Sequence, residues 1–538
     1  MTALSGRWQT IQTILLSLTV LIMTLHVIIY ISFGIALIPF PFDYDQAEGF
    51  ELNNAILLAE GDCPYCDNDV YPFYASGYAP FFHVLMIPFV WLFGAGFWYG
   101  RLIIFVATLL TALAISYAIW REERQIWVAI IAGFAFLASN FIYHIGPLLR
   151  QHLLMVMFET LAVVVIATAF KYQDRQLHKR LFVAFVFLLL AGYTKQLAYS
   201  TGLAVGIWLL LRNPRLAIQY SVGLAVVAGA IFAWAMLVTD GQWWLNIISS
   251  NQNEYITEQF ISLLRLFISL HYPLLLMAGL LALYELYFTR LSAYTIWFVV
   301  SLVSTIGAGK WGAGDSYFAT TLAATCILAG IFTARLLNGR RFINQNHAYA
   351  RFLSRLRLDK RLLSMVALGL FILYGGLVIK LPTSGIYAPI AETLGITPKP
   401  GHRYPLYDSA RWTVGYAVTG HFPSQADYEN GQYIADRVAA TDGIVISEDA
   451  GFAIQNGHEV VTNPVQLRNL WENGLYDPTE LINLLETQEI ELVIRRADLF
   501  PVPVLLAIDT YYELDEEVAM NGFLYQLWIP KSDDSESD

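Results

Sequence analysis

The sequence predicts a mainly α-helical, polytopic membrane protein of about eleven transmembrane helices, followed by a small α/β domain outside the membrane. Hydrophobic residues make up 57% of the 538 residues and charged residues only 14%, whereas a soluble chain is about half apolar and about a quarter charged. The charge is also divided, with 24 Lys and Arg against 18 Asp and Glu in residues 1–381, and 8 against 25 in residues 382–538. We therefore expect a transmembrane domain, 1–381, and an extracytoplasmic soluble domain, 382–538.

The apolar residues gather in runs of about 20, the length that crosses a bilayer as a helix. The first run, 13–37, is too long for a signal-peptide core, so we expect it to be retained as a span. Ten more runs follow, at 101–120, 125–143, 153–171, 181–194, 197–211, 216–238, 262–288, 292–309, 316–335 and 362–381.

The block 78–97 is a twelfth candidate span, and the distribution of Lys and Arg decides its placement. If this block is an interfacial helix, Lys and Arg gather in alternate loops, at 121–124, 171–180, 212–215, 290 and 335–361, while 38–100 and 239–260 contain none. Loops rich in Lys and Arg stay on the cytoplasmic side. We expect a multi-pass protein of the inner (plasma) membrane, with the N-terminus cytoplasmic and the acidic tail outside.

The outer loop 38–100 opens with the stretch "DYDQAEGFE", which places Asp43, Asp45, Glu48 and Glu51 directly after the first span. The loop holds eight carboxylates and no Lys or Arg. Acidic outer loops are common because Asp and Glu contribute little to topology. The loop by itself therefore leaves both a functional and a purely topological interpretation open.

Three cations are expected on the same face as this loop: Arg150 in "GPLLRQH", Lys195 in "GYTKQ" and Lys310 in "GAGKWG". Each has a structural alternative, because Lys and Arg at helix ends extend toward lipid headgroups. Together they lie on the side where the positive-inside rule predicts few cations. Carboxylates in one loop and cations in three others suit an anionic substrate, where carboxylates take up a proton and cations hold a phosphate.

The order of these motifs resembles that of the membrane-embedded glycosyltransferases of the C superfamily, the relatives of protein O-mannosyltransferase and lipid A aminoarabinose transferase. The resemblance covers roughly residues 1–340 and is carried by "DYDQAEG" at 43–49, "YAPF" at 78–81, "LFG" at 92–94 leading to Arg101, and "TKQ" at 194–196. The sequence departs from the family at two places. Pro80 stands alone where the family has paired prolines, and His152 replaces an Asp often found after the third span.

The resemblance implies transfer of a sugar from a polyprenyl-phosphate carrier, with inversion, to a glycan, lipid or protein acceptor outside the cytoplasm. Asp45 is the expected general base, and Asp43 and Glu48 are the alternatives. The phosphate of the donor would be held by cations that neutralise the leaving group, namely Arg150, Lys195 and Lys310.

The expected sugar and acceptor contacts are Tyr78, His152, Trp243 and Trp244, although Trp and Tyr at these depths also form interfacial belts. The sequence points to no particular cofactor, although a divalent metal could supply the same charge, with Asp45, Glu48 and His152 as its candidate ligands. The histidine at position 152 puts that metal in doubt. The acidic tail excludes nucleic acid as a partner.

Two other classes of function remain open, a transporter of polyprenyl-linked glycans and a non-catalytic membrane scaffold. A transporter would concentrate polar residues at the bilayer midplane and often has two related halves, and the sequence has neither feature. Glu159, inside a span, is either functional or part of a structural hydrogen bond. Cys63 and Cys66 in "DCPYC" are expected to form a local disulfide, with a metal or redox pair as the alternative.

Regular structure is also expected in the acidic tail. Helices are predicted near 427–440 and 478–488, and strands at 443–449, 491–496 and 523–530. No catalytic motif is evident in this domain.

Overall fold

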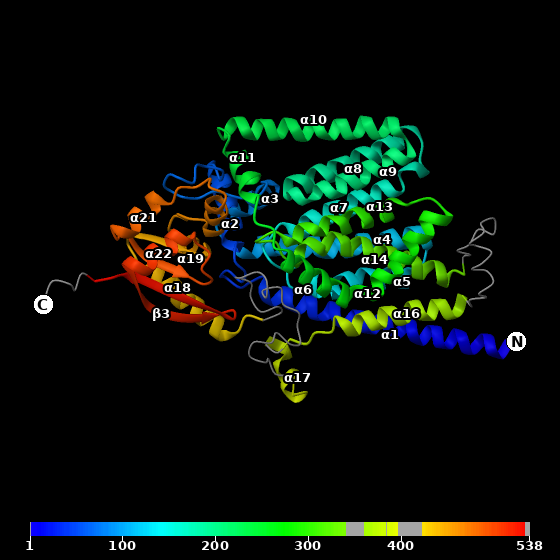
Figure 1. Cartoon of the computed structure of the whole chain (residues 1–538). Coiled ribbons are helices and arrows are strands. Elements are labelled where there is room, and N and C mark those ends of the chain that lie inside the picture. Colours follow the sequence, from blue (N-terminus) through cyan, green and yellow to red (C-terminus); the bar gives the residue numbers. More distant parts are fainter. Residues whose placement is uncertain (1, 340–359, 383–384, 396–421, 533–538) are drawn as a thin grey trace.

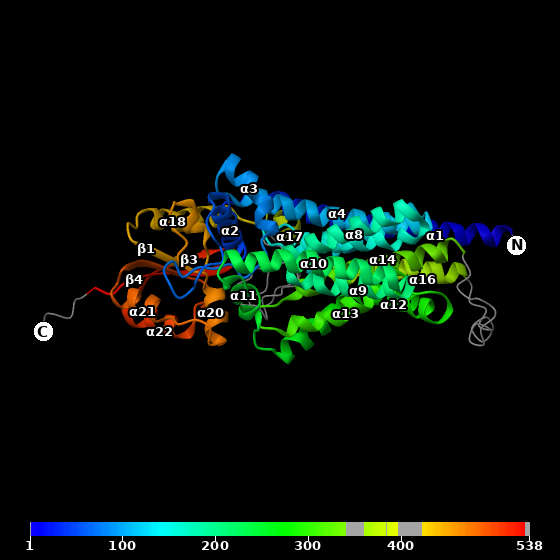
Figure 2. The same ribbon diagram turned by 90° about the horizontal axis from the view of Figure 1, so that it is seen from above.

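The computed structural model describes residues 2–339, 360–382, 385–395 and 422–532. Its long helices run side by side in one bundle (Figure 1). The sheet formed by the tail lies at one end of the bundle, and the N-terminal end of the first helix lies at the other (Figure 2).

Seven helices are long and apolar enough to cross a membrane, so the chain is a multi-pass membrane protein. They are α1 (Thr2–Leu37), α4 (Phe97–Glu123), α7 (His152–Ala167), α8 (Asp174–Thr194), α10 (Pro214–Val238), α12 (Thr257–Phe288) and α14 (Ala319–Leu337). The other four expected runs form shorter helices, α5 (Ile126–Ala138), α9 (Tyr199–Arg212), α13 (Ala293–Ser304) and α16 (Lys360–Leu377). The count of eleven spans therefore stays a prediction.

The sidedness of the chain also stays a prediction, and most of the basic loop 335–361 lies outside the described residues. The block 78–97 contains one helix, α3 (Phe81–Phe93), whose interfacial position is likewise untested. Four further short helices are α2 (Glu48–Glu60), α6 (Asn140–Tyr143), α11 (Gln242–Ile247) and α17 (Ala388–Thr393). Of these, α2 and α11 lie with α3 between the bundle and the sheet (Figure 1).

Helix α10 illustrates why the bundle needs an apolar solvent. The helix starts at Pro214, after Asn213 caps it by accepting a hydrogen bond from the N–H of Leu216. It lies along one edge of the bundle, and its apolar side chains face outward, with Trp234 64% and Leu237 78% exposed. A helix that is apolar on its exposed faces belongs in lipid.

The tail forms one mixed four-stranded sheet in the order β1–β2–β4–β3, confirming the small C-terminal sheet domain. Strands β1 (Ile444–Ser447) and β2 (Ile490–Arg495) are parallel, whereas β4 (Phe523–Pro530) pairs antiparallel with β2 and with β3 (Tyr512–Met520). The accompanying helices are α18 (Gln425–Ala439), α19 (Gly451–Gln455), α20 (Pro464–Glu472), α21 (Thr479–Glu486) and α22 (Val502–Tyr511). The sequence missed β3, α19, α20 and α22.

Aromatic packing joins the sheet domain to the bundle. The chain leaving α1 inserts Phe40 against Tyr428 of α18, with ring centres 5.0 Å apart, and Phe42 against Phe452 of α19 at 5.8 Å. These rings belong to one apolar core that extends from the helices into the sheet. The tail is thus fixed directly over the turn that carries the acidic motif.

A buried arginine on α4 fixes the same turn from the other side. Arg101 donates from Nη1 to the carbonyl oxygens of Leu37 (3.0 Å) and Phe40 (2.5 Å), and from Nη2 to that of Phe42 (2.7 Å). Its Nε and Nη2 also bind the two carboxylate oxygens of Glu48 at 3.0 and 2.7 Å. Arg101 therefore satisfies backbone carbonyls that have no helical partner and neutralises the first carboxylate of α2.

We expect Arg101→Leu to lower the free energy of unfolding by about 3–5 kcal/mol, because it leaves the Glu48 charge buried and unpaired. Thermal unfolding of the purified protein in detergent measures this loss. Arg175→Gln, at an exposed position of α8, is the matched control and should unfold like the wild type. Equal melting temperatures for both variants would contradict the structural role of Arg101.

Candidate active site

The acidic motif lies in the turn between α1 and α2. Ala47, just before α2, has φ +86°, a left-handed conformation that costs a residue with a side chain roughly 1–2 kcal/mol. Contacts on both sides hold it there, because Arg150 donates to the carbonyl of Gln46 (2.9 Å) and Asp43 accepts from the N–H of Gly49 (2.6 Å). The sharp turn directs the carboxylates of the motif toward different partners.

Glu48 is committed to a structural role. Besides its two bonds to Arg101, it accepts a hydrogen bond from the N–H of Leu149 at 2.7 Å. Burial alone would raise the pKa of Glu48, but Arg101 and these N–H donors outweigh burial and lower it. An ionised carboxylate with both oxygens occupied cannot also take up a proton from a substrate. The expectation that Glu48 is a base or a metal ligand does not fit this geometry.

Asp43 joins the turn to the sheet domain. Its second oxygen accepts a hydrogen bond from the N–H of Gly451, at the start of α19, at 2.9 Å. Burial raises the pKa of Asp43, and the neighbouring Asp449 and Glu48 raise it further. The backbone carbonyl of Asp43 also accepts from Asn521 at 3.2 Å. Asp43 thus bridges two parts of the chain and does not face a cavity.

Asp45 differs from both, because one of its oxygens is free. Its Oδ2 pairs with Nη1 of Arg150 at 2.5 Å, whereas Oδ1 is buried and has no hydrogen-bond partner among the described residues. Burial raises the pKa of Asp45 to about 6, against the opposing effect of Arg150. Arg150 lines both of the cavities described next, whereas the Asp45 side chain that it contacts lines neither of them.

All three predicted cations line one cavity of about 360 Å³, together with Tyr78 and His152. The Nζ of Lys195 lies 4.8 Å from the centre of the Tyr78 ring, and that of Lys310 lies 3.5 Å from the carbonyl oxygen of Asn251. Burial and the charge of Arg150 lower the pKa of Lys195 to about 7. Loops that are 45 and 115 residues apart in sequence thus bring their cations together, as the sequence predicted.

A second cavity, of about 200 Å³, adjoins the first and shares Tyr78, Arg150 and Trp311 with it. Its other walls come from α2, through Glu51 and Asn54, and from α20 of the tail, through Gln466, Arg468 and Asn469. The guanidinium of Arg468 lies 4.7 Å above the ring of Trp311, which ties the tail to the loop that carries Lys310. The sheet domain therefore forms one wall of the site.

Sequence reasoning missed several of these residues. Glu51 belongs to the acidic motif but was given no role, and its Oε2 lies 2.5 Å from Nε2 of His83 on α3. The polar residue His83 inside the apolar block 78–97 is the sequence feature that could have indicated a buried partner for Glu51. The contribution of α20 carried no signal, because nothing in its sequence marks it as part of a site.

The two tryptophans expected at the sugar or acceptor side are not in either cavity. Trp243 is buried against Tyr65, with ring centres 4.9 Å apart, and Trp244 is 50% exposed beside Phe232. Both belong to the packing and surface of α11, so the expectation is corrected. The aromatic residues that line both cavities are Tyr78 and Trp311.

Local geometry also corrects the expected disulfide and bears on the two alternatives for Glu159. Cys63 and Cys66 are free thiols, and Sγ of Cys66 donates to the carbonyl of Cys63 at 2.9 Å instead of bonding to its sulfur. Glu159 accepts hydrogen bonds from Thr201 and Thr320, both at 2.6 Å, so its structural alternative is the one observed.

The candidate metal ligands do not form a metal site. Within the described ranges, no three His, Cys, Asp or Glu side chains are grouped so that they could hold an ion. Asp45 is bound to Arg150 and Glu48 to Arg101, while the His152 ring lies beside Tyr317 at 5.7 Å. These residues do not fit the metal alternative, and the positive charge in the site is supplied by Arg150, Lys195 and Lys310.

No protein-family model matches the sequence, and no curated protein matches it. The solved structure of ArnT from Cupriavidus metallidurans bound to undecaprenyl phosphate is similar to this chain with a TM-score of 0.58, at 14% identity, over 94% of this chain and 97% of that one. The chain has the ArnT fold. The resemblance to membrane glycosyltransferases of the C superfamily is thereby confirmed at the level of the fold.

The apo structure of the same ArnT gives a TM-score of 0.56 at 13% identity, again over 94% and 97% of the two chains. The archaeal oligosaccharyltransferase AglB from Archaeoglobus fulgidus, in complex with an inhibitory peptide and a dolichol-phosphate, gives 0.45 at 9% identity over 95% of this chain and 75% of that one. At that TM-score the likeness to AglB adds no argument. The ArnT fold extends over both the helical bundle and the sheet domain of this chain.

We expect Asp43→Asn to loosen the contact between the turn and α19. The amide can accept only through its oxygen, so one of the N–H groups of Gly49 and Gly451 loses its partner, at a cost of about 1–3 kcal/mol. Limited proteolysis should then cut between the bundle and the sheet domain faster than in the wild type. Asp62→Asn, at an exposed carboxylate of the same loop, is the control. Equal cleavage of both variants would argue against the bridge.

Proposed function

We propose that this protein is a glycosyltransferase that moves a sugar, with inversion, from a polyprenyl-phosphate carrier to an acceptor on the outer side of the membrane. The observation that carries the proposal is the position of the Asp45–Arg150 pair at the junction of two cavities, one of which holds three cations. The ArnT fold supports it, because the ArnT structure with the TM-score of 0.58 has undecaprenyl phosphate bound.

The donor would bind in the larger cavity. Arg150, Lys195 and Lys310 would hold its phosphate and neutralise the negative charge that this group gains as it leaves the sugar. The cavity also has apolar lining residues, among them Ile145 and Ile248, next to which a polyprenyl chain can lie. Tyr78 and His152 are among the polar side chains that line the same cavity.

The acceptor would bind in the smaller cavity, between α2 and α20. Its lining of Glu51, Asn54, Gln466 and Asn469 offers hydrogen bonds of both kinds, as a polyhydroxylated or peptide acceptor requires. Because α20 belongs to the tail, we propose that the soluble domain, 382–538, recognises the acceptor and that the transmembrane domain, 1–381, binds the donor. Both sites would then open away from the cytoplasm.

Asp45 would act as the general base. A bound phosphate would draw the Arg150 guanidinium toward itself, uncovering the carboxylate and removing the charge that most strongly opposes its protonation. The acceptor hydroxyl then gives its proton to Asp45 as its oxygen bonds to the anomeric carbon, and the bond from that carbon to the phosphate breaks. A single displacement of this kind inverts the anomeric centre.

The transporter alternative fits the site less well. A transporter binds its cargo near the bilayer midplane. Here the polar groups line cavities at the end of the bundle nearest the sheet domain (Figure 1), between residues of α2 and α20. A scaffold would not need carboxylates and cations to converge on paired cavities.

Asp45→Asn should abolish transfer while leaving insertion in the membrane intact. In cells lacking the protein, mass spectrometry should detect an accumulated lipid-linked sugar and a missing envelope glycan. Wild-type protein should reverse both changes, and the Asn variant at equal abundance should reverse neither. A 10²-fold or greater loss of rate is the order expected for removal of a general base.

Glu51→Gln separates acceptor binding from base catalysis. We expect this variant to raise the KM for the acceptor and to retain turnover at saturating acceptor, because Glu51 lines the acceptor cavity and Asp45 remains. Full loss of turnover in Glu51→Gln together with activity in Asp45→Asn would assign the base to Glu51 and contradict the role of Asp45.

The pH dependence of kcat/KM should be bell-shaped and narrow. Asp45 must be deprotonated, so activity rises as pH increases through its pKa of about 6, and Lys195 must be protonated, so activity falls as pH increases through its pKa of about 7. Initial rates of the purified protein across pH 5 to 9 measure both limbs. Lys195→Arg keeps the charge at all these pH values, so the alkaline limb should disappear. A persistent alkaline limb would exclude Lys195 as its source.

A further inference from the structure

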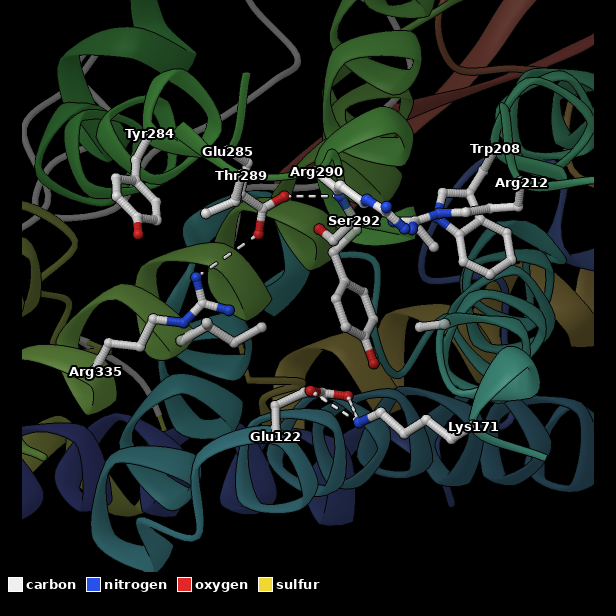
Figure 3. Close-up of a pocket in the computed structure, with 14 residues that line it drawn as sticks. Glu122, Lys171, Trp208, Arg212, Tyr284, Glu285, Thr289, Arg290, Ser292 and Arg335 are labelled. Carbon is white, nitrogen blue, oxygen red and sulfur yellow. Dashed lines mark hydrogen bonds and ion pairs between the residues drawn. The ribbon is translucent and has the colours of Figure 1, made fainter. Parts of the chain in front are cut away.

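A basic cavity of about 380 Å³ lies among the helix ends far from the candidate active site (Figure 3). Helices α4, α7, α9 and α14 start near the outer cavities and end beside this one. Glu122 is at the end of α4, Lys171 just beyond α7, Arg212 at the end of α9 and Arg335 near the end of α14. The connection from α12 to α13 adds Arg290 and Ser292.

The lining carries four cations, Lys171, Arg212, Arg290 and Arg335, but only two carboxylates, Glu122 and Glu285. Both carboxylates are already engaged. Lys171 binds Glu122 at 2.9 and 3.1 Å, while Glu285 accepts from the N–H of Ser292 at 2.8 Å and lies 3.8 Å from Arg335. Arg335 itself is bound to Glu123 at 2.9 Å. Lys171 and Arg335 are therefore each paired with at least one carboxylate.

The two remaining guanidinium groups have no carboxylate partner among the described residues. Arg212 donates to the carbonyl of Leu291 at 2.9 Å, which brings its charge to the backbone beside Arg290, and Arg290 is exposed and forms no ion pair within the described part of the chain. Figure 3 shows both side chains extending into the space between α9 and the α12–α13 connection. Two like charges that converge without an anion repel each other, and a bound anion would remove that repulsion.

Cations at helix ends are expected on the cytoplasmic side of any membrane protein. This cluster differs because its cations surround a hollow whose other walls suit an amphiphile. Trp208, Ala167 and Ile331 supply apolar surface, while the first residues of α13, Ala293 and Tyr294, bring the positive end of a helix to the same space. Basic pockets between transmembrane helices bind the head groups of anionic lipids.

We propose that this cavity binds a phosphate-bearing anion, held by Arg212 and Arg290 at the end of the bundle opposite the sheet domain. The phosphate has two sources, the head group of an anionic phospholipid in the adjacent leaflet or free inorganic phosphate. The site is separate from the proposed donor and acceptor cavities and shares no lining residue with them.

The test uses the full chain, purified and delipidated in an uncharged detergent. Native mass spectrometry titrates phosphatidylglycerol against phosphatidylcholine, and thermal unfolding is followed with inorganic phosphate against chloride at equal ionic strength. The Arg212→Gln/Arg290→Gln variant should bind the phosphate ligand about thirtyfold more weakly, given the usual contribution of each cation near a membrane surface. Arg175→Gln, on the exposed surface of α8, should bind like the wild type.

The two sources give different results. Selective retention of phosphatidylglycerol without a response to inorganic phosphate identifies the lipid head group, and stabilisation by inorganic phosphate identifies the free anion. Arg290→Gln alone should weaken binding about fivefold and decides the case if the double variant does not fold, because Arg290 makes no structural contact in the described chain. Equal binding by wild type and Arg290→Gln, or no preference for either phosphate ligand, would overturn the proposal.

Discussion

The buried pairing of Arg101 with Glu48 is the interaction on which the rest of the candidate active site depends. One guanidinium satisfies three carbonyls of the chain leaving α1 and neutralises the first carboxylate of α2. The turn between these helices is thereby closed, with Ala47 held in a left-handed conformation. In this turn Asp43 and Asp45 have different partners, Gly451 of the sheet domain and Arg150. The strain at Ala47 is offset by contacts on both sides of it.

The site that results is shared between the bundle and the tail. The bundle supplies a carboxylate with one unpaired oxygen, the arginine that covers it, and two lysines from separate loops. The tail supplies α20, which closes the smaller cavity and reaches over Trp311 through Arg468. A reaction between a lipid-linked donor and an outer acceptor needs such an arrangement, since one substrate comes from the bilayer and the other from the aqueous side. Arg150 lines both cavities and so lies at the point where the two substrates would meet.

Charge is distributed differently at the two ends of the bundle. Near the sheet domain, Glu48 and Arg101 form a fully buried pair, Asp45 is paired with Arg150 through one oxygen, and Lys195 and Lys310 line the larger cavity. At the opposite end of the bundle, cations outnumber carboxylates around the basic cavity. Near the sheet domain, burial disfavours the charged form of a side chain, so it raises the pKa of Asp45 and lowers the pKa of Lys195. Around the basic cavity, partial exposure to solvent lowers the cost of the excess positive charge, and the cations stay available to an anion from solution or from the membrane surface.

The sequence alone determined the membrane class, the division into an apolar bundle and an acidic sheet domain, and the family resemblance, because run length and charge segregation follow directly from the cost of placing polar groups in lipid. It also selected Arg150, Lys195 and Lys310, since cations in outer loops contradict the usual bias. Tertiary structure alone decided that Asp45 is the carboxylate of this motif with one oxygen left without a hydrogen-bond partner among the described residues. Asp43, Asp45 and Glu48 are equivalent in sequence, and only their partners, which come from α4, α19 and the loop before α7, distinguish them. It also moved Trp243 into the core and brought α20 to the site, because side-chain direction and long-range docking depend on packing that no local pattern encodes.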